Sequence, residues 1–323
     1  MKPFVVALPS KGRIQEGAFA FLAEAGLPVR RDAEARDYLG ALDGLAGAEV
    51  QLLSAAEVAR ALEAGRVHVG ITGEDLLRDE AASFEERIAI LKPLGFSRAD
   101  VVVAVPQSWI DVRSMADLDD VCLAFRARNH RHLRVATKYV ALTRAFFSAH
   151  GISDYRIVES VGATEGAPAA GTAEIVVDIT STGTTLAANR LKVLEDGLIL
   201  RSEANLAASL AAPWTEEAFA ALRELLDRMA AHADAARLYE VDAVLPEGIS
   251  GALAAEIGAL GAELAGEAGA VTLLCPAASL PALSRALRAA GAGTVRARRP
   301  DYVFRADNPI FDAFRARLDA HGR

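Results

Sequence analysis

The stretch from Glu174 to Leu186 constrains the fold of this chain more than any other part of its sequence. It begins with the β-branched run Ile175-Val176-Val177, which predicts a strand buried in a parallel sheet. Hydroxyl residues around one glycine follow, and a helix-compatible segment begins at Leu186. A strand, a short loop and a helix start in this order direct consecutive backbone N–H groups toward one anion. The sequence therefore predicts a phosphate site at the carboxyl end of a parallel strand.

Side chains in and beside this loop indicate the chemical class of the ligand. The hydroxyls between Thr180 and Thr185 add donors to the backbone N–H groups, and Asp178 lies at the end of the strand. A carboxylate does not bind phosphate, but it accepts hydrogen bonds from two sugar hydroxyls or reaches a cation through water. A phosphate beside a polyol indicates that the ligand is a ribose phosphate.

A second loop of suitable composition lies near the N-terminus. Phe4 to Leu8 predicts a first strand, and an amphipathic helix follows from about residue 15. Between them, Lys11 and Arg13 flank Gly12. Two cations around a glycine suit a polyphosphate, and a solvated turn is the alternative.

Two further segments are candidates for binding nucleotide. Thr72 and Gly73 lie in another turn between a strand and a helix, followed by two carboxylates that would repel phosphate. A pocket for a base or a sugar is therefore the better interpretation of that turn. The segment from Arg126 to Arg134 is the most basic part of the chain. It is either a solvated face or an approach site for a triphosphate.

Composition excludes several classes of function. The 323 residues suggest two or three domains, and a net charge of −8 with a pI near 5.4 argues against nucleic acid as a partner. The N-terminal apolar run is too short for a signal peptide, and no stretch reaches the length of a membrane span. Cys122 and Cys275 belong to no motif and predict buried side chains in a reducing compartment. We therefore expect a cytoplasmic protein.

The alternation of strands and helices predicts the domain organisation. Up to about residue 210 it indicates parallel sheets, whose ligands lie beyond the carboxyl ends of the strands. The pattern changes after Leu238, where the order βα(β)βαβ predicts a ferredoxin-like split βαβ unit. Because this unit holds no cluster of catalytic type, we expect a role in regulation or assembly.

Several blocks together resemble the ATP phosphoribosyltransferases, the enzymes of the first step of histidine biosynthesis. The resemblance covers about residues 4 to 210, and the C-terminal unit resembles the regulatory domain of the family's long form in element order and length only. The blocks that carry it are Leu8–Arg13, Val69–Asp75, Ala136–Tyr139, Gly162–Pro168, and a signature of Glu165, Gly171, Ala173, Val176, Asp178, Thr182, Gly183, Thr185 and Leu186.

The resemblance implies a fold of the α/β class. Two Rossmann-like lobes, similar to periplasmic binding proteins, would enclose a cleft, and a ferredoxin-like α+β domain would follow. The expected bounds are 1–95 with 188–237 for the first catalytic lobe, 96–187 for the second, which carries the phosphoribosyl pyrophosphate loop, and 238–323 for the regulatory or assembly domain. Deletion after about Arg237 would then remove any inhibition by histidine.

The resemblance also implies a reaction. N1 of the adenine of ATP would attack C1′ of 5-phosphoribosyl 1-pyrophosphate, with Mg²⁺ as cofactor, to give N1-(5-phosphoribosyl)-ATP and pyrophosphate. The loop would hold the 5-phosphate, with carboxylates on the ribose hydroxyls and the N-terminal cations on pyrophosphate or triphosphate. No metal ligand stands out. The residues expected to bind phosphoribosyl pyrophosphate are Glu174, Asp178, Thr180, Ser181, Thr182, Gly183, Thr184 and Thr185; those expected to bind ATP or pyrophosphate are Lys11, Gly12, Arg13, Thr72, Gly73 and Glu165; Asp178, Arg13 and Lys11 are expected to act in catalysis.

The expected partners are ATP and phosphoribosyl pyrophosphate as substrates, histidine as an inhibitor, and further copies of this chain in a hexamer or dimer. Nucleic acid and membranes are not expected. Two α/β lobes around a cleft also describe a non-catalytic small-molecule binding protein, which is the alternative from another class. A phosphoribosyltransferase acting on a free base and a purely regulatory subunit are two further alternatives.

Overall fold

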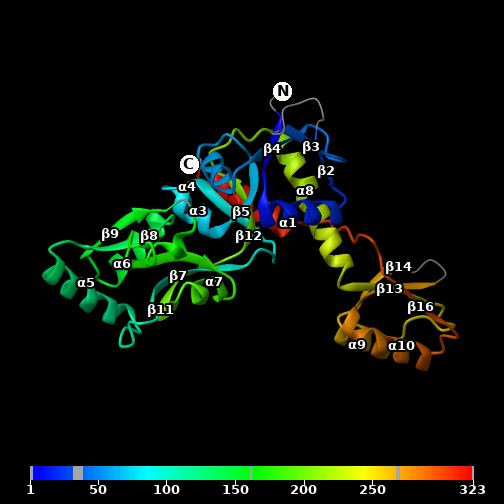
Figure 1. Ribbon diagram of the computed structural model, residues 1–323. Helices are drawn as coiled ribbons and strands as arrows, with labels where there is room; N and C mark the ends of the chain where they lie inside the picture. The colour runs from blue at the N-terminus through cyan, green and yellow to red at the C-terminus, as the bar shows by residue number, and fades with distance from the viewer. Residues whose placement is uncertain (1–2, 32–38, 161, 267–269, 322–323) are drawn as a thin grey trace.

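The computed structural model describes residues 3–31, 39–160, 162–266 and 270–321. The strands form three separate sheets, each with its own hydrophobic core. Figure 1 shows two lobes next to each other and a third unit at the far end of the long helix α8 (Glu216–Ala235). Among the described residues, no helix is long and apolar enough to cross a membrane. The predicted fold class, two α/β lobes with a ferredoxin-like domain, is confirmed.

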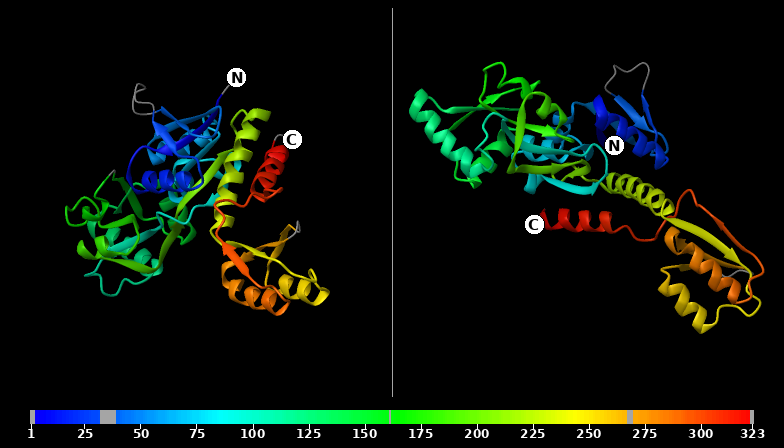
Figure 2. Two further views of the ribbon diagram at one scale, coloured as in Figure 1. Left: turned by 90° about the vertical axis from the view of Figure 1, so that its right-hand side faces the viewer. Right: turned by 60° about the horizontal axis from the view of Figure 1, so that its bottom comes forward.

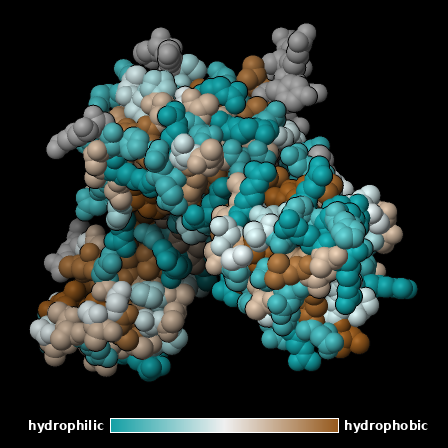
Figure 3. All heavy atoms as spheres, turned by 90° about the vertical axis from the view of Figure 1, so that its left-hand side faces the viewer, coloured by the Kyte–Doolittle hydropathy of each residue, from teal (hydrophilic) through white to brown (hydrophobic). Residues whose placement is uncertain are grey.

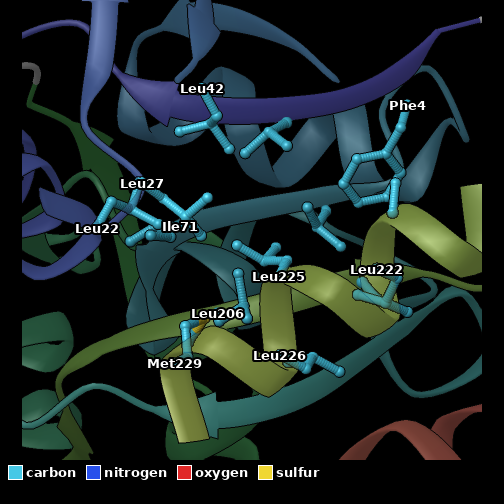
Figure 4. Close-up of a cluster of buried hydrophobic side chains, with 14 of the residues drawn as sticks. Phe4, Leu22, Leu27, Leu42, Ile71, Leu206, Leu222, Leu225, Leu226 and Met229 are labelled. Carbon is cyan, nitrogen blue, oxygen red and sulfur yellow. The ribbon is translucent and has the colours of Figure 1, made fainter. Parts of the chain in front are cut away.

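The first lobe is built on a seven-stranded sheet with the order β2-β3-β4-β1-β5-β12-β6. Its central strand β1 pairs in parallel with β4 and β5, and β12 runs antiparallel between β5 and β6. Phe4, Val6 and Leu8 of β1 enter one core, which α8 covers (Figure 4), while Val5 and Ala7 enter the core on the opposite face. The strands are β1 (Phe4–Pro9), β2 (Val29–Arg31), β3 (Leu39–Leu42), β4 (Ala48–Leu53), β5 (Val69–Gly73), β6 (Ile88–Pro93) and β12 (Ala204–Ser209), and the helices that follow them in the chain are α1 (Gly12–Glu24), α2 (Ala55–Glu63), α3 (Glu74–Glu80) and α4 (Phe84–Arg87).

The second lobe is built on a five-stranded sheet with the order β11-β7-β10-β8-β9. Strand β10 is parallel to β8 and antiparallel to β7, and the β-branched run Ile175-Val176-Val177 within it is fully buried. The predicted buried strand is therefore confirmed. The strands are β7 (Ala99–Pro106), β8 (Leu133–Thr137), β9 (Tyr155–Glu159), β10 (Ile175–Thr180) and β11 (Leu191–Ser202), and the helices are α5 (Met115–Asn129), α6 (Val140–Ala149), the short 3₁₀ turn η1 (Thr164–Gly166) and α7 (Thr184–Ala188).

The chain crosses between the lobes twice, from β6 to β7 and from β11 to β12. The two crossings are hydrogen-bonded, since Ala204 donates to the carbonyl of Phe96 at 3.0 Å. Strand β11 lies along β7 in the second lobe, so the expectation that the first lobe resumes at residue 188 is wrong. The first lobe resumes only with β12, because the long antiparallel pairing with β7 holds the whole of β11 in the other sheet.

The third unit is an antiparallel sheet of order β14-β15-β13-β16. This order and the alternation with two helices are those of the ferredoxin-like fold. Its core contains Val241, Leu273, Leu283 and Leu287. The elements are β13 (Leu238–Ala243), α9 (Gly251–Ala259), β14 (Glu263–Gly266), β15 (Val271–Pro276), the 3₁₀ turn η2 (Ala277–Ser279), α10 (Leu280–Ala289) and β16 (Val295–Arg298).

The last helix, α11 (Pro309–His321), does not belong to the third unit. Phe311 and Phe314 are buried in the first lobe's core, and the helix packs against α8 and β6. Figure 2 shows α11 returning from the third unit toward the first lobe. The expected C-terminal bound of the third domain, residue 323, is therefore wrong, because the apolar side chains of α11 pack in the first lobe. The third domain is an insertion between α8 and α11.

Candidate active site

The loop after β10 has the predicted strand–loop–helix form. Gly183 has φ +76°, a left-handed conformation that favours glycine, and nothing lies within 4 Å of the position a Cβ would take. The hydroxyl of Thr180 accepts the backbone N–H of Gly183 at 2.8 Å, and the hydroxyls of Thr182 and Thr184 are 2.8 Å apart. Side chains from Ser181 to Thr185 are otherwise largely exposed. The loop is thus held by its own hydroxyls and stays open to a ligand.

Asp178 lies at the edge of this loop and is half-buried. Burial raises the pKa of its carboxyl group, the hydrogen bond from Ile179 lowers it, the charge of Glu165 raises it and that of Lys138 lowers it. The backbone N–H of Ile179 donates to Oδ1 of Asp178 at 2.8 Å. Glu165 in η1 and Lys138 after β8 therefore both act on Asp178 near the carboxyl end of β10.

Lys138 is a site residue that the sequence reasoning missed. Strands β8 and β10 pair in parallel with Val135 opposite Ile175 and Ala136 opposite Val176. Continued by two residues, this register places Lys138 opposite Asp178. Lys138 directly follows the segment that forms β8, but only the pairing of β8 with β10 connects it to Asp178.

Glu174 lies at the other end of β10, so its predicted contact with the ribose is wrong. A strand of six residues separates it from the loop by roughly 20 Å. Its carboxylate accepts from Arg131 at 3.0 Å and from Arg134 at 2.8 Å. Burial raises the pKa of Glu174, but the hydrogen bonds from Arg134 and Arg131 outweigh burial and lower that pKa to about 2. Glu174 is therefore a structural ion-pair residue.

The basic segment from Arg126 to Arg134 lies at this same remote end of the second lobe. Arg126 pairs with Asp154, and two of the other arginines pair with Glu174. Figure 3, which views the molecule from the side of the second lobe, shows a largely hydrophilic surface with scattered apolar side chains. Of the two interpretations left open, the structure supports the solvated, ion-paired face.

The cationic loop of the first lobe follows β1 and begins α1. Lys11, Gly12 and Arg13 are exposed, and Gly12 has φ +82° with no atom within 4 Å of a Cβ position. No described residue pairs with the side chains of Lys11 or Arg13. Two cations without a protein partner at the start of a helix of 13 residues have the properties of an anion site.

Thr72 and Gly73, which are predicted to line the nucleotide pocket, are buried in this structure. The hydroxyl of Thr72 donates to the carbonyl of Ala55 at 2.8 Å and so joins β5 to α2. A Cβ on Gly73 would clash with Oδ1 of Asp75. This glycine therefore allows a close approach of the Asp75 side chain to the backbone, and neither residue offers a side chain to ATP in this structure.

Contacts between the lobes bring the two carboxyl edges together. Tyr139, which follows β8, donates its hydroxyl to Asp75, which follows β5, at 2.7 Å. Because β1 is parallel to β5 and β8 is parallel to β10, this contact brings the edge that carries the cationic loop next to the edge that carries the hydroxyl loop. A separate groove of about 710 Å³ beside Arg144 and Arg156 lies at the amino end of β9, away from these loops.

No group of three or more His, Cys, Asp or Glu side chains that could hold a metal ion occurs among the residues that the structure describes. Asp178 and Glu165 are the carboxylates that act on each other at the loop. Mg²⁺ binds one or two carboxylates and takes its remaining ligands from substrate phosphates and water. These two residues therefore fit a metal ion that arrives with a phosphorylated substrate.

Fold and site together define a class: a two-lobed α/β protein with a loop of anion-binding composition in each lobe and an inserted ferredoxin-like domain. A family model described as HisG, ATP phosphoribosyltransferase, matches residues 54–231. The ATP phosphoribosyltransferase of Afipia carboxidovorans is 55% identical over 325 residues, which cover 98% of this chain and 99% of the relative. That of Rhodopseudomonas palustris is 53% identical and covers 99% of this chain and 98% of the relative.

Among solved structures, an ATP phosphoribosyl transferase (HisG:HisZ) complex from Thermotoga maritima matches with a TM-score of 0.53 at 23% identity, over 70% of this chain and 97% of that chain. At this identity the likeness supports the fold alone. The full-length relatives decide the family. The chain belongs to the ATP phosphoribosyltransferase family. It is an enzyme, and the alternative of a non-catalytic binding protein is disfavoured.

Proposed function

We propose that the chain transfers the phosphoribosyl group of 5-phosphoribosyl 1-pyrophosphate to N1 of the adenine of ATP, the first step of histidine biosynthesis. The proposal rests on two loops: an open hydroxyl loop with Asp178 beside it, and a loop with two cations, Lys11 and Arg13, whose side chains pair with no residue that the structure describes. Both lie at carboxyl edges of sheets in a member of this family. A ribose phosphate and a polyphosphate are the ligands that these two loops suit.

In the proposed reaction the N1 lone pair forms a bond to C1′ of the ribose. The bond from C1′ to the pyrophosphate oxygen breaks, and its electron pair leaves with pyrophosphate. Positive charge develops on the ribose ring and negative charge on the leaving group. Positioning and electrostatics therefore carry most of the rate, and no side chain is needed as a general base.

The residues take the following parts in this proposal. The loop from Thr180 to Thr185 holds the 5-phosphate through its hydroxyls and N–H groups. Asp178 accepts hydrogen bonds from the ribose hydroxyls, and its negative charge favours the developing positive charge of the ring. Lys11 and Arg13 hold pyrophosphate or the triphosphate of ATP. The hydrogen bond from the backbone N–H of Ile179 holds the carboxylate of Asp178 in place before substrate arrives.

Reactions of this family generally need a divalent metal ion, and we propose Mg²⁺. When bound, it would neutralise charge on the pyrophosphate leaving group. Asp178 and Glu165 are the residues of this chain that would hold it, together with substrate oxygens. Glu165 raises the pKa of Asp178, so a cation between the two would relieve the repulsion of their charges.

We further propose that the third domain makes the enzyme sensitive to histidine and supports assembly into a hexamer or dimer, and that the enzyme works in the cytoplasm. Deletion after Arg237 does not test the regulatory role, because it also removes α11 from the first lobe. An internal deletion that retains α11 is the appropriate variant, and histidine inhibition that persists in it would contradict the proposal.

The deciding assay incubates the enzyme with ATP, phosphoribosyl pyrophosphate and Mg²⁺ and follows the ultraviolet absorbance of N1-substituted adenine. We expect product with ATP and none with adenine or orotate. Turnover of a free base without turnover of ATP would instead select a phosphoribosyltransferase of another specificity. Binding of both substrates without product would select a purely regulatory subunit.

A further inference from the structure

A buried polar contact joins the two lobes and has no part in the substrate roles above. The hydroxyl of Tyr139 in the second lobe donates to Oδ2 of Asp75 in the first lobe at 2.7 Å. The hydroxyl of Ser202 donates to Oδ1 of the same carboxylate at 2.7 Å and accepts the Asp75 backbone N–H at 3.1 Å. Tyr139 is fully buried and Asp75 is 4% exposed. A carboxylate this deeply buried is tolerated only where hydrogen bonds replace its hydration.

Helix α3 carries this contact and is the first lobe's main link to the second. Leu76 packs against the second lobe's core. Asp79 accepts the backbone N–H of Leu142, at the start of α6, at 2.9 Å. A free N–H group at a helix start is a favourable partner for a carboxylate. Asp75 and Asp79 are four residues apart, so they lie on one face of α3, and that face meets the second lobe.

The contact also lies at the hinge. Ser202 is the last residue of β11, and the chain enters the first lobe two residues later at Ala204. Within the described residues the lobes are connected only by this crossing and by the one near Phe96. Two adjacent connecting segments permit rotation of one lobe against the other. The hydrogen bonds from Tyr139 and Ser202 of the second lobe to Asp75 of the first lobe therefore restrict the hinge where rotation would begin.

The same tyrosine holds a residue of the candidate site. The ammonium group of Lys138 lies 4.7 Å from the centre of the Tyr139 ring, within the range of a cation–π interaction. Lys138 in turn acts on Asp178. Burial and the negative charge of Asp75 raise the pKa of Tyr139, so its hydroxyl remains protonated and remains a donor.

We propose that Asp75, Tyr139 and Ser202 form a hinge lock, which fixes the angle between the lobes and, through Tyr139, the place of Lys138 beside Asp178. The three are positioning residues, since their side-chain polar atoms are hydrogen-bonded to one another and not directed at a substrate. The link to Lys138 and Asp178 rests on the proposed function of that site. The restriction of the hinge does not.

The test variant is Tyr139→Phe, which removes one hydroxyl and keeps the ring under Lys138. The matched control is Tyr155→Phe in the same lobe, whose hydroxyl has no hydrogen-bond partner among the described residues. Ser202→Ala removes the other donor to Asp75 and gives a second reading if Tyr139→Phe does not fold. All three are made in the full chain.

The first measurement is the distance between spin labels, without substrates, on cysteines placed at the exposed residues Ala20 in α1 and Ala124 in α5. The native thiols do not interfere, because Cys122 and Cys275 are buried and burial raises the pKa of Cys122 to about 12. Labelled protein is diluted into an excess of unlabelled protein, so that only distances within one chain are measured. We expect a broader distribution in Tyr139→Phe and Ser202→Ala than in the wild type and Tyr155→Phe.

The second measurement separates KM from kcat. A looser hinge lowers the fraction of molecules in the closed arrangement, and the apparent affinity for both substrates falls by that fraction. We expect KM for ATP and for phosphoribosyl pyrophosphate to rise together by about tenfold or more in Tyr139→Phe, the scale of a hydrogen bond to a charged group, while kcat changes less. Tyr155→Phe should match the wild type.

An unchanged distance distribution in both lock variants would overturn the hinge lock. A fall in kcat at unchanged KM would overturn it as well, since it would assign Tyr139 to the chemical step. The proposed site fails by a different result: Asp178→Asn with normal activity would remove Asp178 from the site, while the label distances, measured without substrate, would still decide the lock.

Discussion

Truncation of the chain after Arg237 will destabilise the first lobe in addition to removing the third domain. The reason is α11, which lies beyond the third domain in the sequence but packs in the first lobe. Arg317 adds a hydrogen bond to the carbonyl of Glu85 at 2.8 Å, which joins the helix to the segment before β6. A truncated protein that loses activity would therefore not show that the third domain is needed for catalysis.

The size of the effect follows from the buried phenylalanines. Phe311 is 8% exposed and Phe314 is 3% exposed, both in the first lobe's core. Full burial of such a side chain contributes about 1.5–3 kcal/mol, so the two together contribute roughly 3–6 kcal/mol. Ile310 and Leu318, partly buried in the same core, add to this. The loss is a large part of the roughly 5–15 kcal/mol that stabilises a typical protein.

A matched variant keeps α11 and removes only the inserted domain. Val303 donates to the carbonyl of Ala231 in α8 at 3.0 Å, so the returning chain runs alongside α8. From Ala231 to Arg237 a helix advances about 9 Å. A Gly/Ser linker of about six residues spans roughly 13 Å on average and can replace residues 238–301.

Urea unfolding of the first lobe is followed by the fluorescence of Trp214, which contacts Phe314 with ring centres 5.0 Å apart. Trp109→Phe in all variants removes the only other tryptophan. We expect the truncated protein to unfold at a markedly lower urea concentration than the linker variant. Equal midpoints for the two would refute the assignment of α11 to the first lobe's core.

Three further predictions concern single sites. Asp178→Asn should lower kcat/KM by an amount that corresponds to about 1.5–3 kcal/mol of transition-state stabilisation, the scale of a hydrogen bond to a charged group. Near-normal steady-state kinetics would exclude Asp178 from the site. Replacing Lys11 and Arg13 together by alanine should raise KM for the polyphosphate substrates about tenfold or more and weaken its dependence on salt, whereas Arg66→Ala, an exposed cation on the same lobe, should change neither. The pKa of Glu174 is about 2 in the folded chain against 4.5 for the free side chain, so the unfolded state binds more protons in this window and the stabilisation is lost as pH falls from about 5 to about 2. Because the arginines are partly exposed, we reduce the expected effect: between pH 5 and about pH 2 the wild type should lose on the order of 2 kcal/mol more unfolding free energy than Glu174→Gln. Urea unfolding at the two pH values measures this difference. Equal losses in the two proteins would contradict the ion pair.

Local patterns were sufficient to predict many elements and the main loop. The strand predicted at Phe4–Leu8 is observed as β1, which ends one residue later at Pro9. Ser54 and Glu57 form a capping box at the start of α2, which is a local pattern because both of its hydrogen bonds join residues three apart. The hydroxyl loop after β10 was predicted for the same reason, since its conformation depends on neighbouring residues and on one glycine.

Features that depend on pairing between distant segments were not predicted. In the sequence Glu174 has the properties of a site carboxylate, and only the pairing of β8 with β10 shows that it binds Arg134 instead. Strand β11 belongs to the second lobe because it pairs with β7, which its sequence does not indicate. Nothing in the sequence of α11 identifies which core its phenylalanines enter. Helix α5 was not predicted, although Ser114 and Asp117 form a capping box at its start.

The position of the third domain within the chain limits how it can influence catalysis. It is attached through α8 at one end and α11 at the other, and both helices pack on the first lobe. Helix α8 contacts β1, whose carboxyl end leads to the cationic loop, and α11 contacts β6, which leads into the first crossing between the lobes. If the third domain moves, we expect it to act on the site either by shifting the cationic loop or by changing the hinge. The second route ends at the crossing hydrogen-bonded to Ala204, two residues from Ser202, so weakening the hinge lock should also change any response to the third domain.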